Sequence, residues 1–260
     1  MQELFRVPKT LQMVCPQSTK STKHHFQSYI GHLVYWVSNA MSIPILARSL
    51  AIIVLANNSL LAQGTGDSRE YIVTVDSKAS GRLTIDYVCN GDESISIDVR
   101  TSMQTRVLFM RYTYSLHVAE RWIDGQLLSL KSKVNDNGTI LTTKLDAAGS
   151  KSELTVNDQS SQQVSTCQAC TTLAFQPRLT GNSVLRMLDV DSGKVVKVAW
   201  KDLGQEKIGV DGSDIACQRF RISDGAETQV WFDEHSRLVK QTFSDSGFQV
   251  VIAQVATKGR

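Results

Sequence analysis

Proline and histidine are scarce in most of this sequence. After Gly64 the chain contains one proline, Pro177, and two histidines, His117 and His235. It also lacks the Gly-x-Ser-x-Gly turn of many hydrolases, a phosphate-binding glycine loop and a His-Glu-x-x-His helix. These absences remove the usual general base of most hydrolase classes. We therefore predict no cofactor and no metal site.

Excess positive charge is missing from the larger part of the chain. The net charge of the whole sequence is +3, but residues 1–63 hold five basic residues and one acidic residue. The remaining 23 basic and 24 acidic residues nearly cancel and are interspersed along the sequence. A nucleic-acid partner is therefore not predicted, because such a partner needs a continuous basic surface.

A run of roughly 20 uninterrupted apolar residues, as a membrane-spanning helix needs, is also absent. The apolar run Leu50–Ala56 follows Arg48 and is followed by small and polar residues, which is the layout of a signal peptide over residues 41–62. We favour cleavage after Ala62, with Ala56 as the alternative site. The sequence thus predicts a periplasmic or secreted protein without a stable membrane span.

Residues 1–40 precede this leader and show no structural period. Since Met41 is itself a suitable start for a signal peptide, we hypothesise that translation begins there. The alternative is a genuine long N-terminal region of the leader. In either case residues 63–260 are expected to form a single β-rich domain.

The chain after Gly64 is rich in short turn signals. Asn-Gly, Asp-Gly and Asp-Ser-Gly steps favour tight hairpin turns, because these residues tolerate positive φ. They occur at Asn90-Gly91, Asp124-Gly125, Asn137-Gly138, Asp191-Ser192-Gly193, Asp211-Gly212, Asp224-Gly225 and Asp245-Ser246-Gly247. Apolar and polar residues alternate between these turns, as in Leu83–Tyr87 and Ile95–Arg100, which indicates half-buried strands.

Helix signals are few. The best candidate is Ser183–Val190, whose apolar residues fall on one side of a helix. The polar stretch Asn157–Thr166 is expected to form an exposed loop, at which a division into two lobes is the alternative to one domain. We predict an all-β fold, mainly an antiparallel meander that curves into a half-barrel or barrel-like sheet, with one or two short helices.

Four cysteines lie in the expected exported domain, where thiols can oxidise. Cys167 and Cys170 have the spacing of redox and zinc motifs, but no strand-to-helix context and no second close pair accompany them. Structural disulfides are the favoured interpretation, with Cys167–Cys170 and Cys89–Cys217 as the expected pairing. Redox activity, metal binding and free thiols are the alternatives.

Candidate catalytic residues each have a simpler structural interpretation. His117 lies in an aromatic-rich strand and His235 in a turn, where structural roles predominate. Glu120 and Asp124 are four residues apart, which on a strand separates them by roughly 13 Å. That distance exceeds the separation of about 5 to 9.5 Å between paired glycosidase carboxyls, so no catalytic residue is assigned.

Two short blocks carry a resemblance to a known family. The first contains Tyr112-x-Tyr114, Glu120-x-Trp122-x-Asp124-Gly125-x-Leu127, Ser132 and Asn135-Asp136-Asn137-Gly138, and the second Trp231-Phe232-Asp233 with Leu238-Val239-Lys240. From Tyr71 to Val255 the chain resembles the exported bacterial family known as domain of unknown function 6134. The resemblance implies a β-rich fold and no particular activity, and the Cys167/Cys170 segment departs from the family pattern. The Trp-hydrophobe-Asp strand is also similar to half-barrel carriers that shuttle lipid-modified proteins through the periplasm, which is an analogy of fold.

Three aromatic residues are candidates for ligand binding. Tyr114, Trp122 and Trp231 are amphipathic strand residues that either fill a core or line the mouth of a cavity. We expect a non-enzymatic protein that binds a hydrophobic ligand or lipid-like group on the concave face of a curved sheet. The alternative is an envelope module that binds a protein through exposed edge strands. An enzyme using Glu120 or His117 ranks third.

Overall fold

The computed structural model describes residues 66–107, 110–179, 183–223, 227–245 and 247–259. The expected signal peptide and both cleavage sites lie outside these residues. The described residues form fifteen strands: β1 Gly66–Val75, β2 Lys78–Cys89, β3 Ile95–Val107, β4 Met110–Ile123, β5 Gln126–Asp136, β6 Thr139–Ala148, β7 Lys151–Val156, β8 Gln162–Ser165, β9 Ala169–Cys170, β10 Ser183–Asp189, β11 Lys194–Val210, β12 Ser213–Ser223, β13 Glu227–Phe232, β14 Leu238–Asp245 and β15 Phe248–Gly259.

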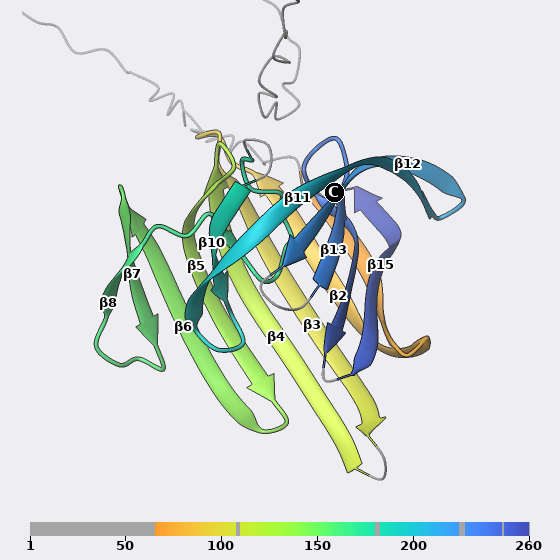
Figure 1. The fold of residues 1–260 in the computed structure, drawn as a ribbon, viewed down its shortest axis with the longest axis horizontal. Coiled ribbons are helices and arrows are strands. Elements are labelled where there is room, and N and C mark those ends of the chain that lie inside the picture. The colour runs from red at the N-terminus through yellow and green to blue at the C-terminus, as the bar shows by residue number, and fades with distance from the viewer. Residues whose placement is uncertain (1–65, 108–109, 180–182, 224–226, 246, 260) are drawn as a thin grey trace, which may run out of the picture. The chain divides into compact units, whose positions relative to one another are not determined.

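All fifteen strands belong to one sheet, in the order β8-β7-β6-β5-β4-β3-β2-β1-β15-β14-β13-β12-β11-β10-β9 (Figure 1). Neighbours pair antiparallel, except that β9 pairs parallel with β10. The first and last strands, β1 and β15, lie side by side in the middle of the sheet. The prediction of an all-β, mainly antiparallel meander is therefore confirmed.

The predicted helix at Ser183–Val190 is wrong, and the described part of the chain contains no helix at all, so none is long and apolar enough to cross a bilayer. Ser183–Asp189 is instead strand β10, which pairs with the valine-rich start of β11. Leu185 and Met187 are buried while Val184 is exposed, so the period-two pattern decides the conformation. Backbone pairing with β11 outweighs a weak local helix signal.

Several predicted turns have the backbone that their residues favour. Asp124-Gly125, Asn137-Gly138 and Asp211-Gly212 each combine two residues with positive φ. That conformation matches the twist of the flanking strands and is what two-residue hairpins need. Part of the expected Asn157–Thr166 loop is different, because Gln162–Ser165 forms the edge strand β8 on β7.

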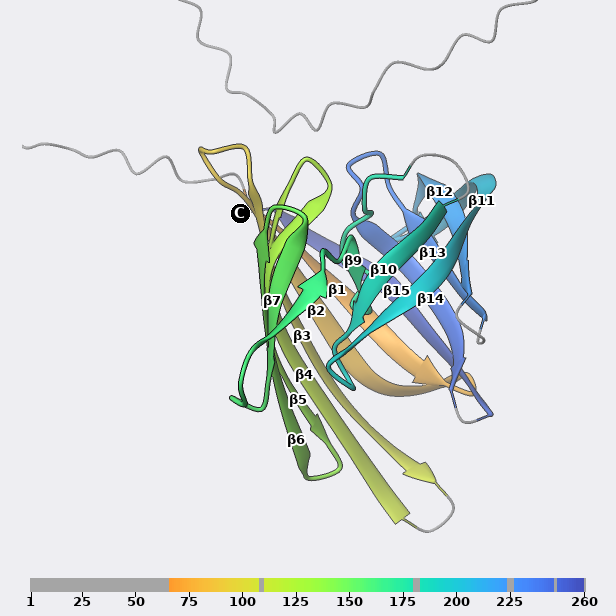
Figure 2. The same cartoon turned by 60° about the vertical axis from the view of Figure 1, so that its left-hand side comes forward.

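Alternating side chains of the strands build the core. In β3, Ile97 and Val99 are buried, whereas Asp98 and Arg100 face the opposite side. Each such buried aliphatic side chain contributes about 1.5–3 kcal/mol. Figure 2 shows the two arms of the sheet, β4–β7 and β10–β15, facing each other across this interior.

The two edges of the sheet meet at a short crossing. Thr166 N donates to Ser150 O (3.4 Å) beside β7, and Gln168 N donates to Arg186 O (2.9 Å) in β10. The chain thus passes from one edge to the other around the buried Cys167. No ladder of strand pairs joins β8 to β9 among the described residues, so the sheet is curved but not closed.

Candidate functional site

An irregular segment lies inside the curved sheet. We call residues Thr171–Leu179, which follow β9, the interior strap. Leu173, Ala174 and Phe175 are at most 4% exposed, and Thr172 and Pro177 are also buried. The strap therefore occupies the face of the sheet where the sequence suggests a ligand.

The β4–β5 hairpin holds the strap through a buried carboxyl group. Glu120 points inward from β4 and is 3% exposed. Its Oε1 accepts hydrogen bonds from Thr172 Oγ1 (2.6 Å) and Cys170 Sγ (3.2 Å), and its Oε2 accepts one from Trp122 Nε1 (2.7 Å). Burial raises the pKa of Glu120 above its ordinary value, against the opposing effect of these donors. The carboxyl group joins β4 to both the strap and β9.

The turn of the same hairpin touches the strap directly. Gly125 has a φ of +69°, and its carbonyl accepts a hydrogen bond from Arg178 N (3.0 Å). A Cβ atom at position 125 would lie 2.9 Å from that nitrogen, which is closer than packing allows. Glycine is required here by both the turn and the approach of the strap.

The β13–β14 hairpin also binds the strap through backbone hydrogen bonds. Phe175 forms an antiparallel bridge with Arg237. Gln176 N donates to Ser236 O (2.8 Å), and Leu238 N donates to Ala174 O (3.2 Å). The phenyl ring of Phe175 lies 5.5 Å from the Trp122 indole, centre to centre. Both hairpins therefore clasp one segment.

Asp233 shapes the second hairpin and ties it to β1. Its Oδ1 accepts the backbone N–H groups of His235 and Arg237 (2.9 Å each), and its Oδ2 binds Arg69 Nη2 at 2.6 Å. Asp67 Oδ2 bridges Arg69 (3.0 Å) and Arg237 (2.6 Å). Burial opposes the charge on Arg69, but the Asp233 carboxylate holds the pKa of Arg69 above its usual value.

Two buried tyrosines donate hydrogen bonds to the strap and to the β13–β14 hairpin. Tyr87 OH donates to Ala174 O of the strap (2.7 Å), and Tyr71 OH donates to Leu238 O of the hairpin (2.6 Å). Burial raises the pKa of both phenols, so both stay protonated as donors. The Arg69 and Arg237 guanidinium groups lie 5.6 and 5.2 Å from the centre of the Tyr87 ring.

The cysteines beside the strap are buried, whereas both histidines of the described residues are exposed. Burial raises the pKa of Cys167 to about 11 and raises that of Cys170 well above its ordinary value, which leaves both thiols protonated and unreactive. His117 is exposed on the opposite face of β4, with Nε2 2.9 Å from Asp98. His235 is an exposed residue beside Glu234.

The expected disulfides are absent, because all four cysteines are free thiols. Cys170 Sγ donates a hydrogen bond to Glu120 Oε1 (3.2 Å), whereas Cys167 Sγ lies 3.9 Å from Ser165 O. Cys89 belongs to the main core and Cys217 to a separate cluster with Val210, Trp231 and Val239. The predicted Cys89–Cys217 pair is thus divided between two apolar clusters.

The three aromatic candidates are not brought together. Trp122 packs in the main core and is 1% exposed. Trp231 is 4% exposed in the second cluster, where its Nε1 donates to Glu206 Oε2 (2.8 Å). Tyr114 is partly buried and donates to Asp191 Oδ1 (2.7 Å). Of the three, Trp122 contacts the strap.

No local sequence pattern marks several of the residues that hold the strap. Arg69, Thr172 and Arg237 lie in three distant segments, and their roles depend on contacts between those segments. A charged residue inside an alternating strand was the one available sign for Arg69, since it sits at an inward position of β1 and is 5% exposed.

Comparison with known proteins agrees with this geometry. The family model for the domain of unknown function DUF6134 matches residues 71–254. The chain belongs to this family. The matched range of this DUF6134 chain contains the β4–β5 and β13–β14 hairpins and the strap, whereas Asp67 and Arg69 precede it.

A solved structure shows the same type of fold. The crystal structure of a β-barrel-like protein of domain of unknown function DUF1849 from Brucella abortus is similar, with a TM-score of 0.59 and 11% identity. The match covers 76% of the DUF6134 chain and 99% of the other chain. A search of curated proteins finds no match.

Proposed function

We propose that this DUF6134 chain is an exported, non-catalytic binding protein that receives a hydrophobic, lipid-like ligand inside its curved sheet when the strap withdraws. One observation carries the proposal: the interior face is covered by an irregular strap rather than by a further strand of the sheet. Export rests on the predicted signal peptide, and periplasmic or secreted localisation follows from it.

The apolar side chains that the strap buries set the size of the ligand that could replace them. Withdrawing the strap removes Leu173, Phe175 and Pro177 from the core, which costs about 1.5–3 kcal/mol for each of the first two side chains. Since each buried methylene contributes about 0.8 kcal/mol, an acyl chain of roughly four to eight carbons replaces the contacts of Leu173 and Phe175. A small polar molecule supplies no such compensation.

The route for withdrawal lies at the crossing between the sheet edges. The strap follows β9, which has two residues and pairs only with Met187 and Leu188 among the described residues. The strap meets the hairpins through one backbone hydrogen bond at Gly125 and one isolated two-bond bridge at Phe175 and Arg237, rather than through a ladder. Withdrawal of the strap breaks these bonds, the Thr172–Glu120 and Tyr87–Ala174 hydrogen bonds and the apolar packing of the strap, but it breaks no pair in the strand order of the sheet.

A covalent tether tests the proposal. Gln176 and Ser236 are half-exposed and are joined by a backbone hydrogen bond across the strap–hairpin bridge (2.8 Å), so we place the tether at this pair. We expect the double variant Gln176→Cys with Ser236→Cys to bind a fluorescent long-chain fatty acid when reduced and to lose binding when oxidised. The two single variants, treated in the same way, are the controls.

Equal binding by the oxidised and reduced double variants would show that the strap does not gate the interior. Native mass spectrometry of protein purified from an exported compartment supplies the second measurement. A bound lipid-like mass supports the proposal, and protein that neither carries nor takes up any apolar ligand contradicts it.

An exposed edge favours a second candidate function. Val184 is 70% exposed on β10, beyond the part of that strand that β9 covers. Such an edge accepts a strand of an envelope protein through main-chain hydrogen bonds. A photoreactive residue in place of Val184 should then crosslink to one defined protein in the producing cell, whereas the same residue in place of exposed Lys197 should not.

A further inference from the structure

The outer face of β2–β6 carries a strong excess of basic side chains. Between Arg82 and Asp146, three acidic side chains point outward from these strands: Asp86, Asp98 and Asp146. Eight basic side chains point the same way: Arg82, Arg100, Arg106, Arg111, Arg121, Lys131, Lys133 and Lys144. His117 lies among them. We call the eight basic side chains and His117 the basic face.

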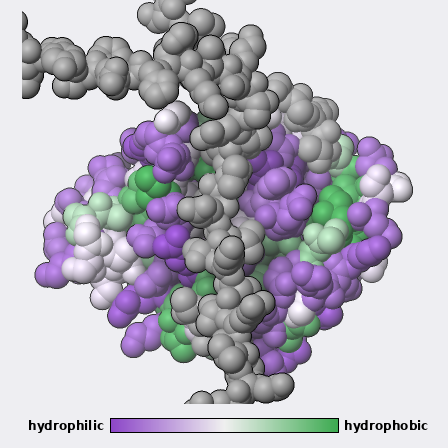
Figure 3. Space-filling view, turned by 90° about the horizontal axis from the view of Figure 1, so that it is seen from above, coloured by the Kyte–Doolittle hydropathy of each residue, from purple (hydrophilic) through white to green (hydrophobic). Residues whose placement is uncertain are grey.

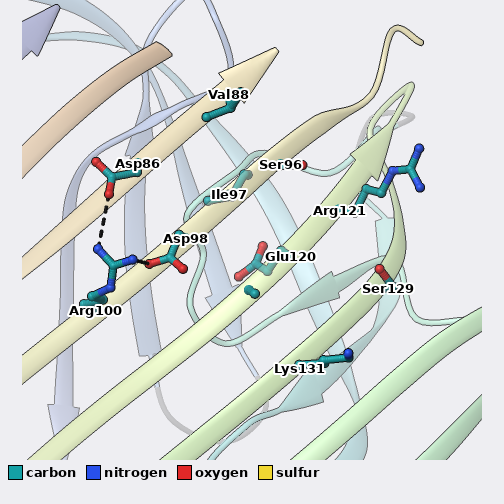
Figure 4. A pocket seen from close by; sticks show the side chains of 11 residues that line it. Asp86, Val88, Ser96, Ile97, Asp98, Arg100, Glu120, Arg121, Ser129 and Lys131 are labelled. Carbon is teal, nitrogen blue, oxygen red and sulfur yellow. Dashed lines mark hydrogen bonds and ion pairs between the residues drawn. The ribbon is translucent and has the colours of Figure 1, made fainter. Parts of the chain in front are cut away.

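Two shallow grooves lie on the basic face and share Arg100. The first has a volume of about 400 Å³ and is bordered by Asp98, Arg121 and Lys131, with the small residue Ala119 at its floor. The second, of about 430 Å³, is bordered by His117, Lys133 and Ile140. Figure 4 shows Arg100 held by Asp86 and Asp98, with Lys131 pointing away from both acids.

The two lysines of the grooves are left without anions. Neither Lys131 nor Lys133 has an ion-pair or hydrogen-bond partner in the described parts of the chain. Lys131 lies directly opposite Lys144, and Arg106 directly opposite Arg111. Like charges at opposite positions of paired strands destabilise a sheet. Asp146 compensates Lys144 (2.7 Å), so the uncompensated charge of the Lys131–Lys144 pair lies on Lys131.

An apolar residue accompanies these cations. Ile140 borders the second groove and is 53% exposed on β6. Lysines beside an exposed aliphatic side chain are the combination found on surfaces that lie on anionic membranes. No phenylalanine, tyrosine or tryptophan side chain points outward from β2–β6 in the described residues, so this face lacks the large rings on which single-stranded bases usually stack.

We propose that the basic face binds phosphate groups of anionic lipids at a membrane surface, with Lys131 and Lys133 contacting phosphates and Ile140 entering the headgroup layer. This surface is opposite to the interior strap and is independent of the ligand proposed there. Each lysine near an anionic membrane contributes enough attraction for roughly a fivefold gain in affinity.

Vesicle binding tests the assignment. Purified protein is titrated with vesicles of phosphatidylglycerol and phosphatidylcholine, and with phosphatidylcholine alone. We expect binding to the anionic vesicles only, and about 30-fold weaker binding after Lys131→Gln with Lys133→Gln. Lys197→Gln with Lys201→Gln on β11 removes the same charge elsewhere and should change binding less than threefold, a margin set by long-range attraction alone.

Soluble glycerol phosphate and Ile140→Ser separate the possible sources of phosphate. Ile140→Ser should weaken vesicle binding by roughly fivefold and leave binding of glycerol phosphate unchanged. Equal losses in the two double-lysine variants would overturn the proposal, because they would indicate net charge alone. Binding of glycerol phosphate or duplex DNA as tightly as vesicles would also overturn it, in favour of a soluble anion or a nucleic acid.

Discussion

Thr172→Val is expected to loosen the strap by removing one hydroxyl group. The Thr172 hydroxyl donates to Glu120 Oε1 at 2.6 Å and lies 3.0 Å from Cys170 Sγ. Valine keeps the shape of the side chain, and Glu120 retains its bond from Trp122. Leaving a buried acceptor without its donor costs about 1–3 kcal/mol, so we expect a loss of about 2 kcal/mol.

Urea unfolding measures this loss. With a slope of about 2 kcal/mol per molar urea, a loss of about 2 kcal/mol moves the midpoint down by about 1 M at unchanged slope. Thr142→Val on the outward-facing side of β6 is the matched control, and its free energy of unfolding should change by less than about 0.5 kcal/mol.

A midpoint for Thr172→Val within error of the Thr142→Val midpoint would refute the reasoning. The carboxyl network would then contribute nothing to holding the strap. The cost of Thr172→Val should also be smaller below the raised pKa of Glu120 than above it, because a hydrogen bond to a neutral carboxyl group contributes about 0.5–1.5 kcal/mol and one to a charged group about 1.5–3 kcal/mol.

Three further predictions address the same site. Burial raises the pKa of Glu120 in the folded state above 4.5, so the folded state binds more protons than the unfolded state. The free energy of unfolding should therefore fall as pH rises from 4.5 through the raised pKa. Glu120→Gln should flatten this dependence, which unfolding measured at a series of pH values would show. Gly125→Ala should cost about 1–3 kcal/mol more by calorimetry than Gly138→Ala, since both have positive φ but only the first would meet the strap backbone. Cys167 and Cys170 should resist a thiol reagent in the native protein and react fully in urea, and rapid native labelling would contradict the raised thiol pKa values.

Local patterns were sufficient for most of the sheet. Alternation in Ile95–Arg100 predicted which side chains of β3 face the core, and Asp124-Gly125 predicted a tight turn, because both depend on neighbouring residues. Ser183–Val190 was wrong because its apolar residues suit a helix and a strand alike, and pairing with β11 decided between them. The disulfide prediction failed since cysteine spacing says nothing of which apolar cluster receives each thiol.

The sequence by itself determined the all-β class and the positions of many hairpins, since strand alternation and turn chemistry act over a few residues. Only the tertiary structure decided that Glu120 and Asp233, on hairpins far apart in the chain, hold one strap. It also decided that charges interspersed along the sequence gather as a basic face, because the pleat and strand register place alternate residues of neighbouring strands side by side.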